Sequence, residues 1–545
     1  MTFSEFYCNA STGVNINAGS TTGAAVVTST NGDWGNAAAN RFTASAGTPF
    51  SGVSVGDFAS VYLDGATTAV YIARVTAVNG GGASIDLSST AKSGTAPSTG
   101  ASGRSCTVGG AWKGPNGTEA FPFGFVEAGM TNSAGDQPRV NFKNNATYSI
   151  TAAMTHGNIG PVRFQGYTSS VGDGGLAKID GGASGASYTL LNLSSGGMNQ
   201  LCDFECTRNG ATGTTGALIA IATNVLRRVV VHDVRGAGFF MSGSPAMLIE
   251  CEAYNCNQGS AANTGAFHFP SGSTVIQLIR CIAHDNTTGT TDGFRFTSSA
   301  AGLVNMIGCI SDTNSGRGAI ITLTSGCRAV IGNCDFYNNT SDGLTIDVTT
   351  ATTGNAILNI ENSNFVKNGG YGIQGTSSGR KLGMVQNCGF GGGGSANTSG
   401  STATLDQMEI AGSVNYTGHP WNDPANGDFR ITDASSKSAG RGAFTQTASS
   451  YTGTVGYPDI GSAQHQETPT NVFNIIGRRT LRQYPAATHV RNRVQYLQST
   501  VSLPAPFFVR AKTRVVERYR YRNRVSISQT ILQTNLVLSP VKKVR

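Results

Sequence analysis

The sequence predicts an all-β protein built around a single-stranded right-handed parallel β-helix, a three-sheet solenoid whose successive coils stack on one another. The composition is the first indication, because the chain has 73 Gly among 545 residues and only 12% charged residues. The second is the recurrence of short apolar or β-branched runs between Gly, Asn and Ser clusters, typical of many short strands joined by tight turns. The third is an internal repeat between about residues 195 and 390, because periods of this length indicate a solenoid.

A first series of markers follows a β run in six consecutive segments. The markers are 30, 28, 25, 29 and 25 residues apart, and they are Cys251, Cys281, Cys309, Cys334, Ser363 and Cys388. Stacked coils place like residues above like in one dry core, and Cys is a small, readily buried hydrophobe. We therefore expect a ladder of buried free thiols, with an Asn five or six residues later in a turn. Disulfides are disfavoured because side chains in a ladder run parallel, and metal is disfavoured because no C-x-x-C or H-x₃₋₅-H spacing occurs.

A second series of markers, all glycines, precedes the next strand of each coil. These glycines are 27, 28, 25, 25 and 29 residues apart, and they are Gly238, Gly265, Gly293, Gly318, Gly343 and Gly372. Glycine readily adopts a positive φ. We therefore expect these residues to supply a positive φ at a corner of each coil.

The ends of the repeat divide the chain into four expected regions. Alternating strands and a Gly-Gly turn over residues 55–87 suggest a small antiparallel β insertion near the amino end. A solenoid also needs caps, because its terminal coils expose unpaired strand edges. We therefore expect a cap region at 1–138, the β-helix at 139–415, a capping segment at 416–465 and a basic, β-rich tail at 466–545.

Several further motifs point to one family. The chain opens on FYCNASTGVNINAGSTTG, and the repeat is followed by N-D-P-x-x-G-D-F-R-I (Asn422–Ile431) and P-D-I-G (Pro458–Gly461). Together with the stacked coils, these motifs resemble the right-handed β-helix proteins of the pectin-lyase-like superfamily. More narrowly, they resemble its non-lyase branch in bacterial surface proteins and bacteriophage structural proteins. The resemblance covers roughly residues 1–465 and leaves the tail unmatched.

The resemblance raises the question of catalysis, because the superfamily includes pectate lyases, polygalacturonases and polysaccharide-cleaving phage tailspikes. Polygalacturonase-like enzymes carry N-T-D, D-D and G-H-G elements. Here Asp292, Asp312 and Asp342 are expected in turns, and the chain has no D-D pair and no G-H-G. No acidic cluster of the kind that binds calcium in pectate-lyase-like enzymes is evident either. The chemistry of the family therefore does not transfer to this chain, and no cofactor is expected.

An outward row on the strands that follow the glycine markers is a candidate ligand site. If the alternate Phe residues of these strands face the core, the outward row is Phe240, His268, Arg295, Ile320, Thr345 and Gln374. An aromatic platform with flanking hydrogen-bond donors suits a polyhydroxylated ligand. Phe240, His268, Arg295 and Gln374 are therefore the candidate ligand-binding residues. The alternative is a decorated surface sheet without a ligand.

A second polar cluster lies in LRRVVVHDVRG and contains Arg227, Arg228, His232, Asp233 and Arg235. A His beside an Asp could perform acid/base chemistry. Neighbours on a strand point to opposite faces, so His232 and Asp233 pair only if the strand has ended. Salt-bridged scaffolding is therefore the preferred interpretation, and it also applies to His284 and Asp285.

The tail has the opposite charge to the rest of the chain. Residues 466–545 hold 15 Lys and Arg against Glu467 and Glu517, so the tail carries +13 and the remainder of the +8 chain carries −5. Nucleic acid is disfavoured as a partner, because alternation in RYRYR (518–522) separates Arg from the Tyr rings that would stack on bases. We therefore expect a protein partner, with an acidic glycan and the chain's own acidic body as alternatives. The candidate contacts are Arg491, Arg493, Arg518, Arg520, Arg522 and Arg524.

These observations favour a non-enzymatic structural or adhesive β-helix that presents a glycan- or surface-binding solenoid. The tail would attach it to a partner, and a homo-oligomer is compatible with this arrangement. The start of the chain lacks a secretory signal pattern, and no apolar run reaches the roughly 18 residues that span a bilayer. A phage virion therefore fits better than ordinary secretion, and the cell surface is the other expected location. The two alternatives are a tailspike-like polysaccharide lyase or glycoside hydrolase, and an exported carbohydrate-binding surface protein.

Overall fold

The structure is a computed structural model in which the chain divides into two compact units, Met1–Thr488 and His489–Arg545. The described residues are 3–11, 25–35, 38, 40–64, 71–89, 93–94, 96–112, 114, 137–156, 162–193, 199–220, 224–242, 246–270, 275–297, 302–323, 327–348, 356–376, 381–392, 398–400, 408–411, 414–431, 462, 507–511 and 536–540.

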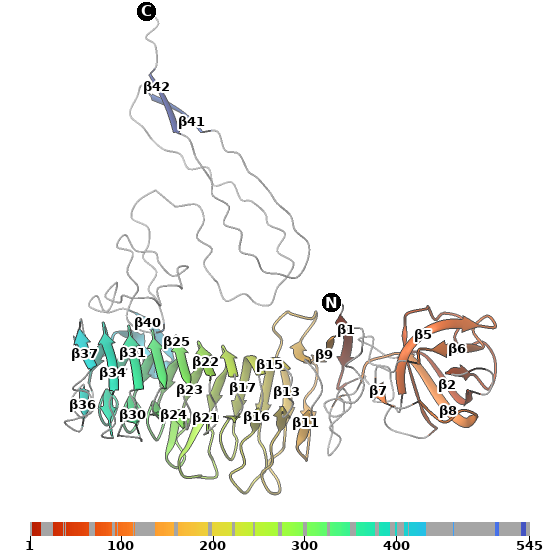
Figure 1. Ribbon diagram of the computed structural model, residues 1–545, viewed down its shortest axis with the longest axis horizontal. Coiled ribbons are helices and arrows are strands. Elements are labelled where there is room, and N and C mark those ends of the chain that lie inside the picture. Colours follow the sequence, from red (N-terminus) through yellow and green to blue (C-terminus); the bar gives the residue numbers. More distant parts are fainter. Residues whose placement is uncertain are drawn as a thin grey trace, which may run out of the picture. The chain divides into compact units, whose positions relative to one another are not determined.

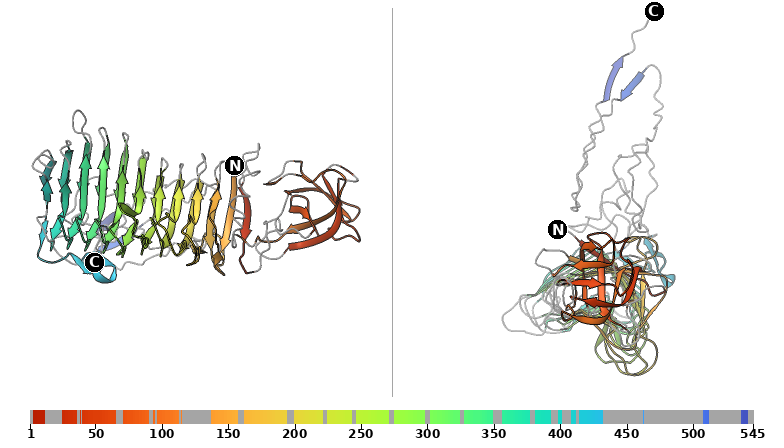
Figure 2. Two further views of the ribbon diagram at one scale, coloured as in Figure 1. Left: turned by 90° about the horizontal axis from the view of Figure 1, so that it is seen from below. Right: turned by 90° about the vertical axis from the view of Figure 1, so that its right-hand side faces the viewer.

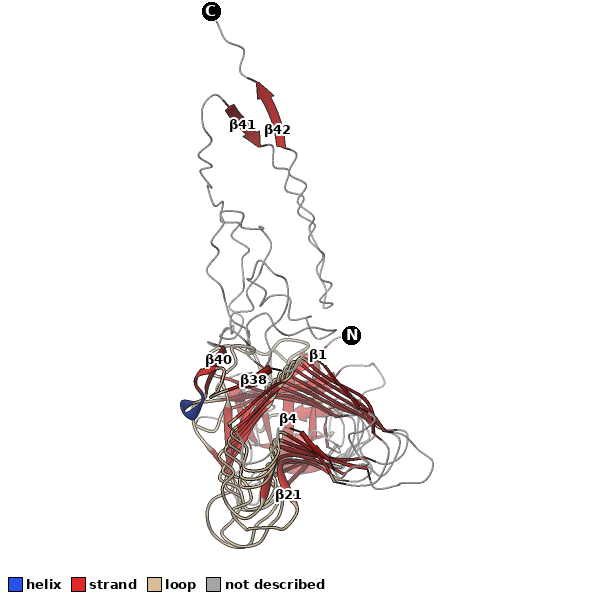
Figure 3. Ribbon diagram, turned by 90° about the vertical axis from the view of Figure 1, so that its left-hand side faces the viewer, coloured by secondary structure: helices blue, strands red, loops and turns tan. Residues whose placement is uncertain are grey.

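The body of the first unit is a parallel β-helix with three sheets, which we number in the order in which each coil passes through them (Figures 1 and 3). The first sheet contains β1 (Phe3–Cys8), β9 (Gln137–Lys143), β12 (Arg163–Tyr167), β15 (Asn199–Thr207), β17 (Asn224–His232), β19 (Ala246–Ile249), β22 (Val275–Ile279), β25 (Leu303–Ile307), β28 (Arg328–Gly332), β31 (Ala356–Glu361), β34 (Lys381–Gln386) and β37 (Met408–Ala411).

The long strands β15 and β17 continue into the second sheet. Its other strands are β10 (Tyr148–Ser149), β13 (Ala177–Asp180), β20 (Glu252–Tyr254), β23 (Ile282–His284), β26 (Ile310–Asp312), β29 (Asp335–Tyr337), β32 (Asn364–Val366), β35 (Gly389–Gly391) and β38 (Val414–Tyr416). The third sheet has ten strands: β11 (Met154–His156), β14 (Leu191–Leu193), β16 (Leu218–Ala220), β18 (Phe239–Met241), β21 (Thr264–Phe269), β24 (Thr291–Thr297), β27 (Ala319–Leu323), β30 (Leu344–Val348), β33 (Ile373–Gly375) and β36 (Thr398–Gly400).

Like residues stack on like inside the solenoid, and this stacking holds the coils together. Phe239, Phe267 and Phe294 form one column, with ring centroids 4.6 and 4.9 Å apart and nearly parallel planes. Phe269 and Phe296 form a second column at 4.9 Å. All five rings are fully buried, so the expected core-facing Phe positions are confirmed.

The cysteine ladder is confirmed as well. All eleven cysteines of the chain are buried free thiols. In the ladder, each thiol donates to a backbone carbonyl of the preceding coil: Cys251 Sγ lies 3.5 Å from Leu226 O, and Cys281 Sγ lies 3.5 Å from Leu248 O. Ser363, which takes the same position, donates its hydroxyl to Glu361 O at 2.9 Å.

The glycine ladder is present, but the reason we expected for it is wrong. Gly238, Gly293, Gly318 and Gly343 do not have a positive φ. A Cβ on Gly318 would instead lie 2.5 Å from Gly343 O and 2.7 Å from the Phe336 ring. Close approach of the next coil, not backbone conformation, therefore requires glycine. Gly265 also lies outside the ladder, because it pairs with Asp292 while Ala266 occupies the position in line with Gly293.

The expected turn asparagines form a buried ladder of hydrogen bonds. Asn286 Nδ2 donates to Asn314 Oδ1 at 2.7 Å, and this pattern continues through Asn339 to Asn368 at 2.9 Å per step. The positive φ falls on the preceding residue of each turn, for example 53° at Asn338. Carboxamides suit this inward position because each one can both donate and accept.

A seven-stranded antiparallel barrel is inserted between the first two strands of the solenoid (Figure 2). Its strands are β2 (Ala25–Trp34), β3 (Arg41–Thr43), β4 (Phe58–Leu63), β5 (Tyr71–Asn79), β6 (Ser84–Leu87), β7 (Ser93–Gly94) and β8 (Ala101–Gly109). It is larger than the unit expected at 55–87, because β2 and β8 pair through register shifts that obscure their alternation in the sequence. β1 pairs in parallel with β9, so part of the expected cap region is the first rung of the solenoid.

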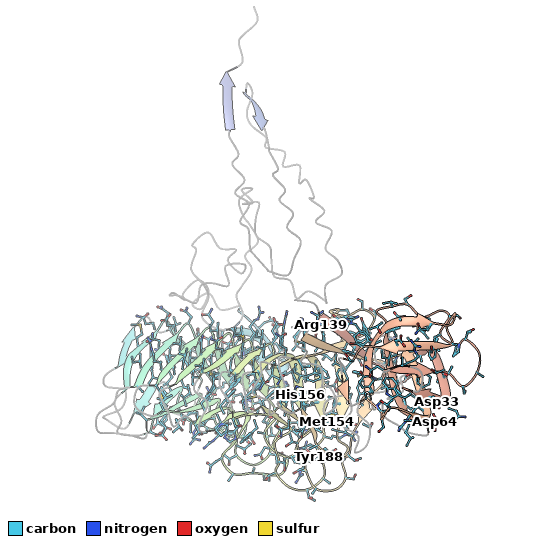
Figure 4. All side chains as sticks on the ribbon, turned by 45° about the vertical axis from the view of Figure 1, so that its right-hand side comes forward. Asp33, Asp64, Arg139, Met154, His156 and Tyr188 are labelled. Carbon is cyan, nitrogen blue, oxygen red and sulfur yellow. The ribbon has the colours of Figure 1, made fainter. Side chains whose placement is uncertain are left out.

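Polar contacts join the first coils. Arg139 Nη1 donates to Glu5 Oε1 at 2.6 Å, and Tyr188 Oη donates to Ile150 O at 2.8 Å. Met154 and His156 of β11 are buried in the same coils, whereas Asp33 and Asp64 belong to the barrel (Figure 4). The barrel has a separate hydrophobic core.

A hairpin follows the last described coil. It contains β39 (Trp421–Asp423), the 3₁₀ turn η1 (Pro424–Asn426) and β40 (Asp428–Ile431). Trp421 and Phe429 pack on Tyr337 of the second sheet. In the second unit, the structure describes one antiparallel pair, β41 (Phe507–Ala511) and β42 (Leu536–Pro540).

Candidate functional site

The candidate ligand row of the third sheet lies in register across six consecutive strands. Backbone pairing places each residue of the row beside the next one, as expected. The pairs are Phe240 with His268, His268 with Arg295, Arg295 with Ile320, Ile320 with Thr345 and Thr345 with Gln374. The coils repeat about every 4.8 Å, so the row presents a regular series of side chains.

The row is not uniformly accessible. Ile320 is 8% exposed and Thr345 is 1% exposed. Phe240, His268, Arg295 and Gln374 are half-buried. These four residues, which we call the third-sheet row, are therefore the members of the row that a ligand could reach.

Asp292 fixes the position of Arg295. Arg295 Nη1 donates to Asp292 Oδ2 at 2.9 Å, and the backbone N–H of Arg317 in the next coil donates to Asp292 Oδ1 at 2.9 Å. Gly316 leaves room for this carboxylate, because a Cβ there would lie 2.6 Å from Oδ1. Burial raises the pKa of Asp292, although the Arg317 N–H and the two guanidinium groups oppose this shift. Asp292 was expected in a turn, but it lies in β24.

The same arrangement recurs two coils later at Asp342. Thr345 Oγ1 donates to Asp342 Oδ2 at 2.8 Å, and the Tyr371 backbone N–H donates to Asp342 Oδ1 at 2.9 Å. Arg317 lies between the two carboxylates, 3.7 Å from Asp292 and 4.0 Å from Asp342. Asp342 lies in a turn as expected, whereas Asp312 ends strand β26. The carboxylates of Asp292 and Asp342 therefore hold the coil corners and the arginines.

His268 is an uncharged member of the third-sheet row at neutral pH. Burial lowers the pKa of His268 to about 4, and the neighbouring Arg295 contributes to the same shift. Its ring packs edge-on against Phe240 with centroids 5.2 Å apart. A neutral imidazole both donates and accepts a hydrogen bond. The row therefore combines an aromatic ring, a neutral donor and acceptor, and a guanidinium that Asp292 has already oriented.

The second predicted cluster is a scaffold on the second sheet. Arg228 Nε donates to Asp203 Oδ1 at 2.5 Å, and Arg227 is exposed. His232 is the last residue of β17, and Asp233 has a φ of 55°. The strand has therefore ended, and His232 Nδ1 lies 2.7 Å from Asp233 Oδ2.

The contact recurs two coils later, as the scaffold interpretation of His284 and Asp285 predicts, whereas the stacking between the coils was not predicted. His284 lies 2.8 Å from Asp285 and 2.9 Å from Glu252, while His232 lies 3.1 Å from Glu205. Tyr254 stacks between the two imidazoles, with centroids 4.6 Å from His232 and 5.0 Å from His284. The signal in the sequence was the repetition of His-Asp in one register, at 232–233 and 284–285. Because the ring faces cover one another, this stack offers no platform for a ligand.

Burial and partners act on the ionisation of this stack in opposite directions. Burial lowers the pKa of His284, but hydrogen bonds with Glu252 and Asp285 outweigh burial, so the pKa is raised. Burial raises the pKa of nearby Asp312 to about 6. Within the described residues, no group of three or more His, Cys, Asp or Glu is arranged to hold a metal ion.

The six tail residues of the expected basic contact, Arg491, Arg493, Arg518, Arg520, Arg522 and Arg524, lie outside the described residues. In the described part of the chain, no helix is long and apolar enough to cross a membrane.

A match to a family model supports the fold. Residues 215–412 match a family model described as a right handed beta helix region. Curated protein sequences give no match. Among solved structures, the chain is similar to the pectate lyase Pel9A, with 15% identity and a TM-score of 0.37 over 65% of this chain and 96% of that chain.

Two further solved structures are also similar. The A-module of the Azotobacter vinelandii mannuronan C-5 epimerase AlgE4 has 13% identity and a TM-score of 0.36, over 52% of this chain and 89% of that chain. The catalytic domain of a GH87 alpha-1,3-glucanase has 10% identity and a TM-score of 0.26, over 71% of this chain and 89% of that chain. Likenesses this distant transfer no activity. The strand register and the family match together identify the body of this chain as a right-handed parallel β-helix, as the resemblance to pectin-lyase-like proteins predicts.

Proposed function

We propose that this protein is a non-enzymatic glycan-binding β-helix and that the third-sheet row is its binding surface. The observation that carries the proposal is the register that places Phe240, His268 and Arg295 on adjacent coils, all half-buried rather than covered. A chain-like ligand could follow the row from coil to coil.

The chemistry of the row suits a polyhydroxylated ligand. A sugar ring offers C–H groups to an aromatic ring and hydroxyls that both donate and accept hydrogen bonds. Phe240 supplies the aromatic ring, His268 supplies a neutral donor and acceptor, and Arg295 supplies donors held in place by Asp292. Pre-oriented side chains lose little conformational entropy on binding.

The carboxylates of this face favour binding over catalysis. A glycosidase of the usual kind needs two carboxyl groups facing the scissile bond. Asp292 is 2% exposed and Asp342 is 5% exposed, and both accept backbone N–H groups of the next coil. Both are therefore occupied with the scaffold.

Direct binding measurements test the proposal. We would screen the full chain against an array of oligosaccharides from bacterial capsules and lipopolysaccharides, and then measure the dissociation constant of each hit. Phe240→Ala and His268→Ala should each weaken binding about tenfold, the loss expected for one good contact of about 1.4 kcal/mol. Gln277→Ala, at a half-buried outward position on the first sheet, is the matched control. Equal affinity of all variants would refute the site.

A lyase is the second candidate, because one observation favours it. His268 stays neutral near pH 7 and lies beside Arg295, so it could accept a proton while the guanidinium stabilises a developing negative charge. Incubating the array hits with the protein and following the ultraviolet absorbance of unsaturated products distinguishes the two functions. If the protein depolymerises a glycan and His268→Ala abolishes this activity, the protein is a lyase and not a glycan-binding protein without enzymatic activity.

We further propose that the basic tail attaches the β-helix to a protein partner, as in a phage virion. The support is the net charge of +13 on residues 466–545 against −5 on the rest of the chain. Deleting residues 466–545 should abolish assembly and leave glycan binding unchanged. Assembly that survives this deletion would remove the tail from the proposal.

A further inference from the structure

The outer face of the first sheet carries a stripe of apolar side chains. In β17, β19, β22, β25, β28 and β31, inward residues alternate with outward ones. We call the outward apolar residues of these strands the first-sheet stripe: Val225, Met247, Ile249, Val275, Ile279, Leu303, Ile307, Val330 and Ile357. Ile357 is 39% exposed and the others are half-buried. Contiguous apolar patches on a soluble surface mark interaction sites.

Charged residues stand at the two ends of this stripe. One column of outward positions runs, coil by coil, from Arg227 through Ile249, Ile279, Ile307 and Gly332 to Glu361. Arg227 is exposed, and it forms no ion pair with the other described residues. Glu361 is 9% exposed, and its Oε2 lacks a hydrogen-bond partner within the described structure. Among the described residues, these six positions therefore run from an unpaired cation to an unsatisfied carboxylate, and the column continues beyond them to Cys202 and Gln386.

These ends complement one another in a second, antiparallel copy. The twofold axis of such a pair runs parallel to the strands, between β22 and β25. It reverses the order of the coils, so each column faces the same column of the partner in the opposite order. The first position of the column then meets the sixth, so Arg227 of each copy faces Glu361 of its partner. Ile279 meets Ile307, and Ile249 meets Gly332, which leaves room for it.

The neighbouring columns obey the same symmetry. In the middle column, Gln277 meets Asn305, so two amides face one another, and Met247 meets Val330. In the column at the strand starts, Val275 meets Leu303. Val225 and Asn359 do not complement one another. In the column at the strand starts, the exposed Arg328 and Ile357 meet positions that lie outside the described residues.

We propose that a second copy of this chain docks on the first-sheet stripe in antiparallel orientation and forms a twofold dimer. The face is small: six rungs about 4.8 Å apart and about five residues wide cover roughly 450 Å² per partner. Interfaces of this size are at the low end of specific contacts, so the dimer is expected to be weak and reversible, with a dissociation constant in the micromolar range.

Charge reversal tests the docking and its direction together. Sedimentation velocity of the full wild-type chain at pH 8 and low salt should show a reversible doubling of the mass. In the single variants Arg227→Glu and Glu361→Lys, the dissociation constant of the dimer should rise at least tenfold. Burial raises the pKa of the Glu361 carboxyl, and pH 8 is chosen to keep it ionised.

Mixing the two variants provides the test of direction. In a 1:1 mixture, an antiparallel pair can form between one Arg227→Glu chain and one Glu361→Lys chain. At one end of its interface the two substituted side chains meet, and their charges are again opposite. At the other end the unchanged Arg227 and Glu361 meet as in the wild type. We therefore expect dimers to reappear on mixing.

Rescue within one chain does not explain such a result, because residues 227 and 361 are five coils, about 24 Å, apart. Circular dichroism melts test whether each variant is folded. If one of the two variants does not fold, Ile279→Lys takes its place. An assembly through the tail would keep its mass in all variants. A wild-type chain that stays monomeric at 1 mM, single variants that dimerise normally, or a mixture that stays monomeric would each overturn the proposal.

Discussion

At the scale of single residues, the imidazoles of His232 and His284 are held between carboxylates from two directions. One carboxylate comes from the next residue, which turns back through a positive φ, and the other comes from the preceding coil. Stacking on Tyr254 fixes the ring planes. The result is a pair of clamped imidazoles that serve the scaffold.

His284 should stabilise the fold mainly at low and neutral pH. Its folded pKa is raised above the ordinary value of 6.5, so its contribution is complete below pH 6.5 and is lost as the pH rises through the folded pKa. His284→Gln should therefore lower the free energy of unfolding by about 1–2 kcal/mol at pH 6, and by less at pH 9. Urea denaturation across this range measures the effect.

His268 provides the matched control, because its pKa is shifted in the opposite direction. Its folded pKa is about 4. As the pH falls from 6.5 towards 4, the imidazole is therefore protonated in the unfolded chain but not in the folded one, and the wild type loses stability. His268→Gln should remove part of that loss. If both variants had the same pH dependence as the wild type, the assignment of these ionisations would be wrong.

At the scale of the coil, close stacking limits side-chain size at the corners. A Cβ at Gly318 would approach the next coil at 2.5 Å, whereas a Cβ at Gly418 meets nothing within 4 Å. Gly318→Ala should therefore destabilise the protein by about 1–3 kcal/mol through overpacking. Gly418→Ala is the control and should be nearly neutral. Thermal and urea unfolding of the two variants compare them directly, and equal stabilities would argue against this account of the ladder.

The amino-terminal barrel should fold by itself. It closes its own sheet through the pairing of β4 with β5, and Trp34, Phe42 and Phe50 belong to its separate core. Residues 25–109, expressed alone, should therefore give a cooperative thermal transition and dispersed amide NMR signals. A disordered spectrum would mean that the barrel depends on the solenoid, for example through the contact of Phe58 with Phe6 at 5.4 Å.

At the scale of the whole molecule, the outer faces of the solenoid differ in character. The third sheet presents a polar and aromatic row, the second presents carboxylate-clamped imidazoles, and the first presents aliphatic residues. Loops extend past the edge of the third sheet near β21 (Figure 3). The proposed ligand binding on the third sheet and the proposed dimerisation through the first sheet therefore use different faces.

The repeat predicted these faces only in part. The Cys ladder, the Phe columns and the third-sheet row follow from period and alternation, which the sequence displays directly. The misalignment of Gly265 arises because the loop at 255–263 changes the local spacing. The pairing of His232 with Asp233 depends on where a strand ends, and the role of Asp292 depends on Arg317 in the next coil. The contact between Asp292 and Arg317 joins two coils and therefore leaves no mark in any one segment.

The most direct measurement is hydroxyl-radical footprinting of the full chain, with and without an oligosaccharide that it binds. The account predicts protection of Phe240 and His268 on the third sheet, and unchanged reactivity of Ile357 on the first sheet at protein concentrations below the dimer dissociation constant. Protection confined to the barrel or to the first sheet, with Phe240 and His268 unaffected, would contradict the claim that this β-helix binds glycan along its third-sheet row.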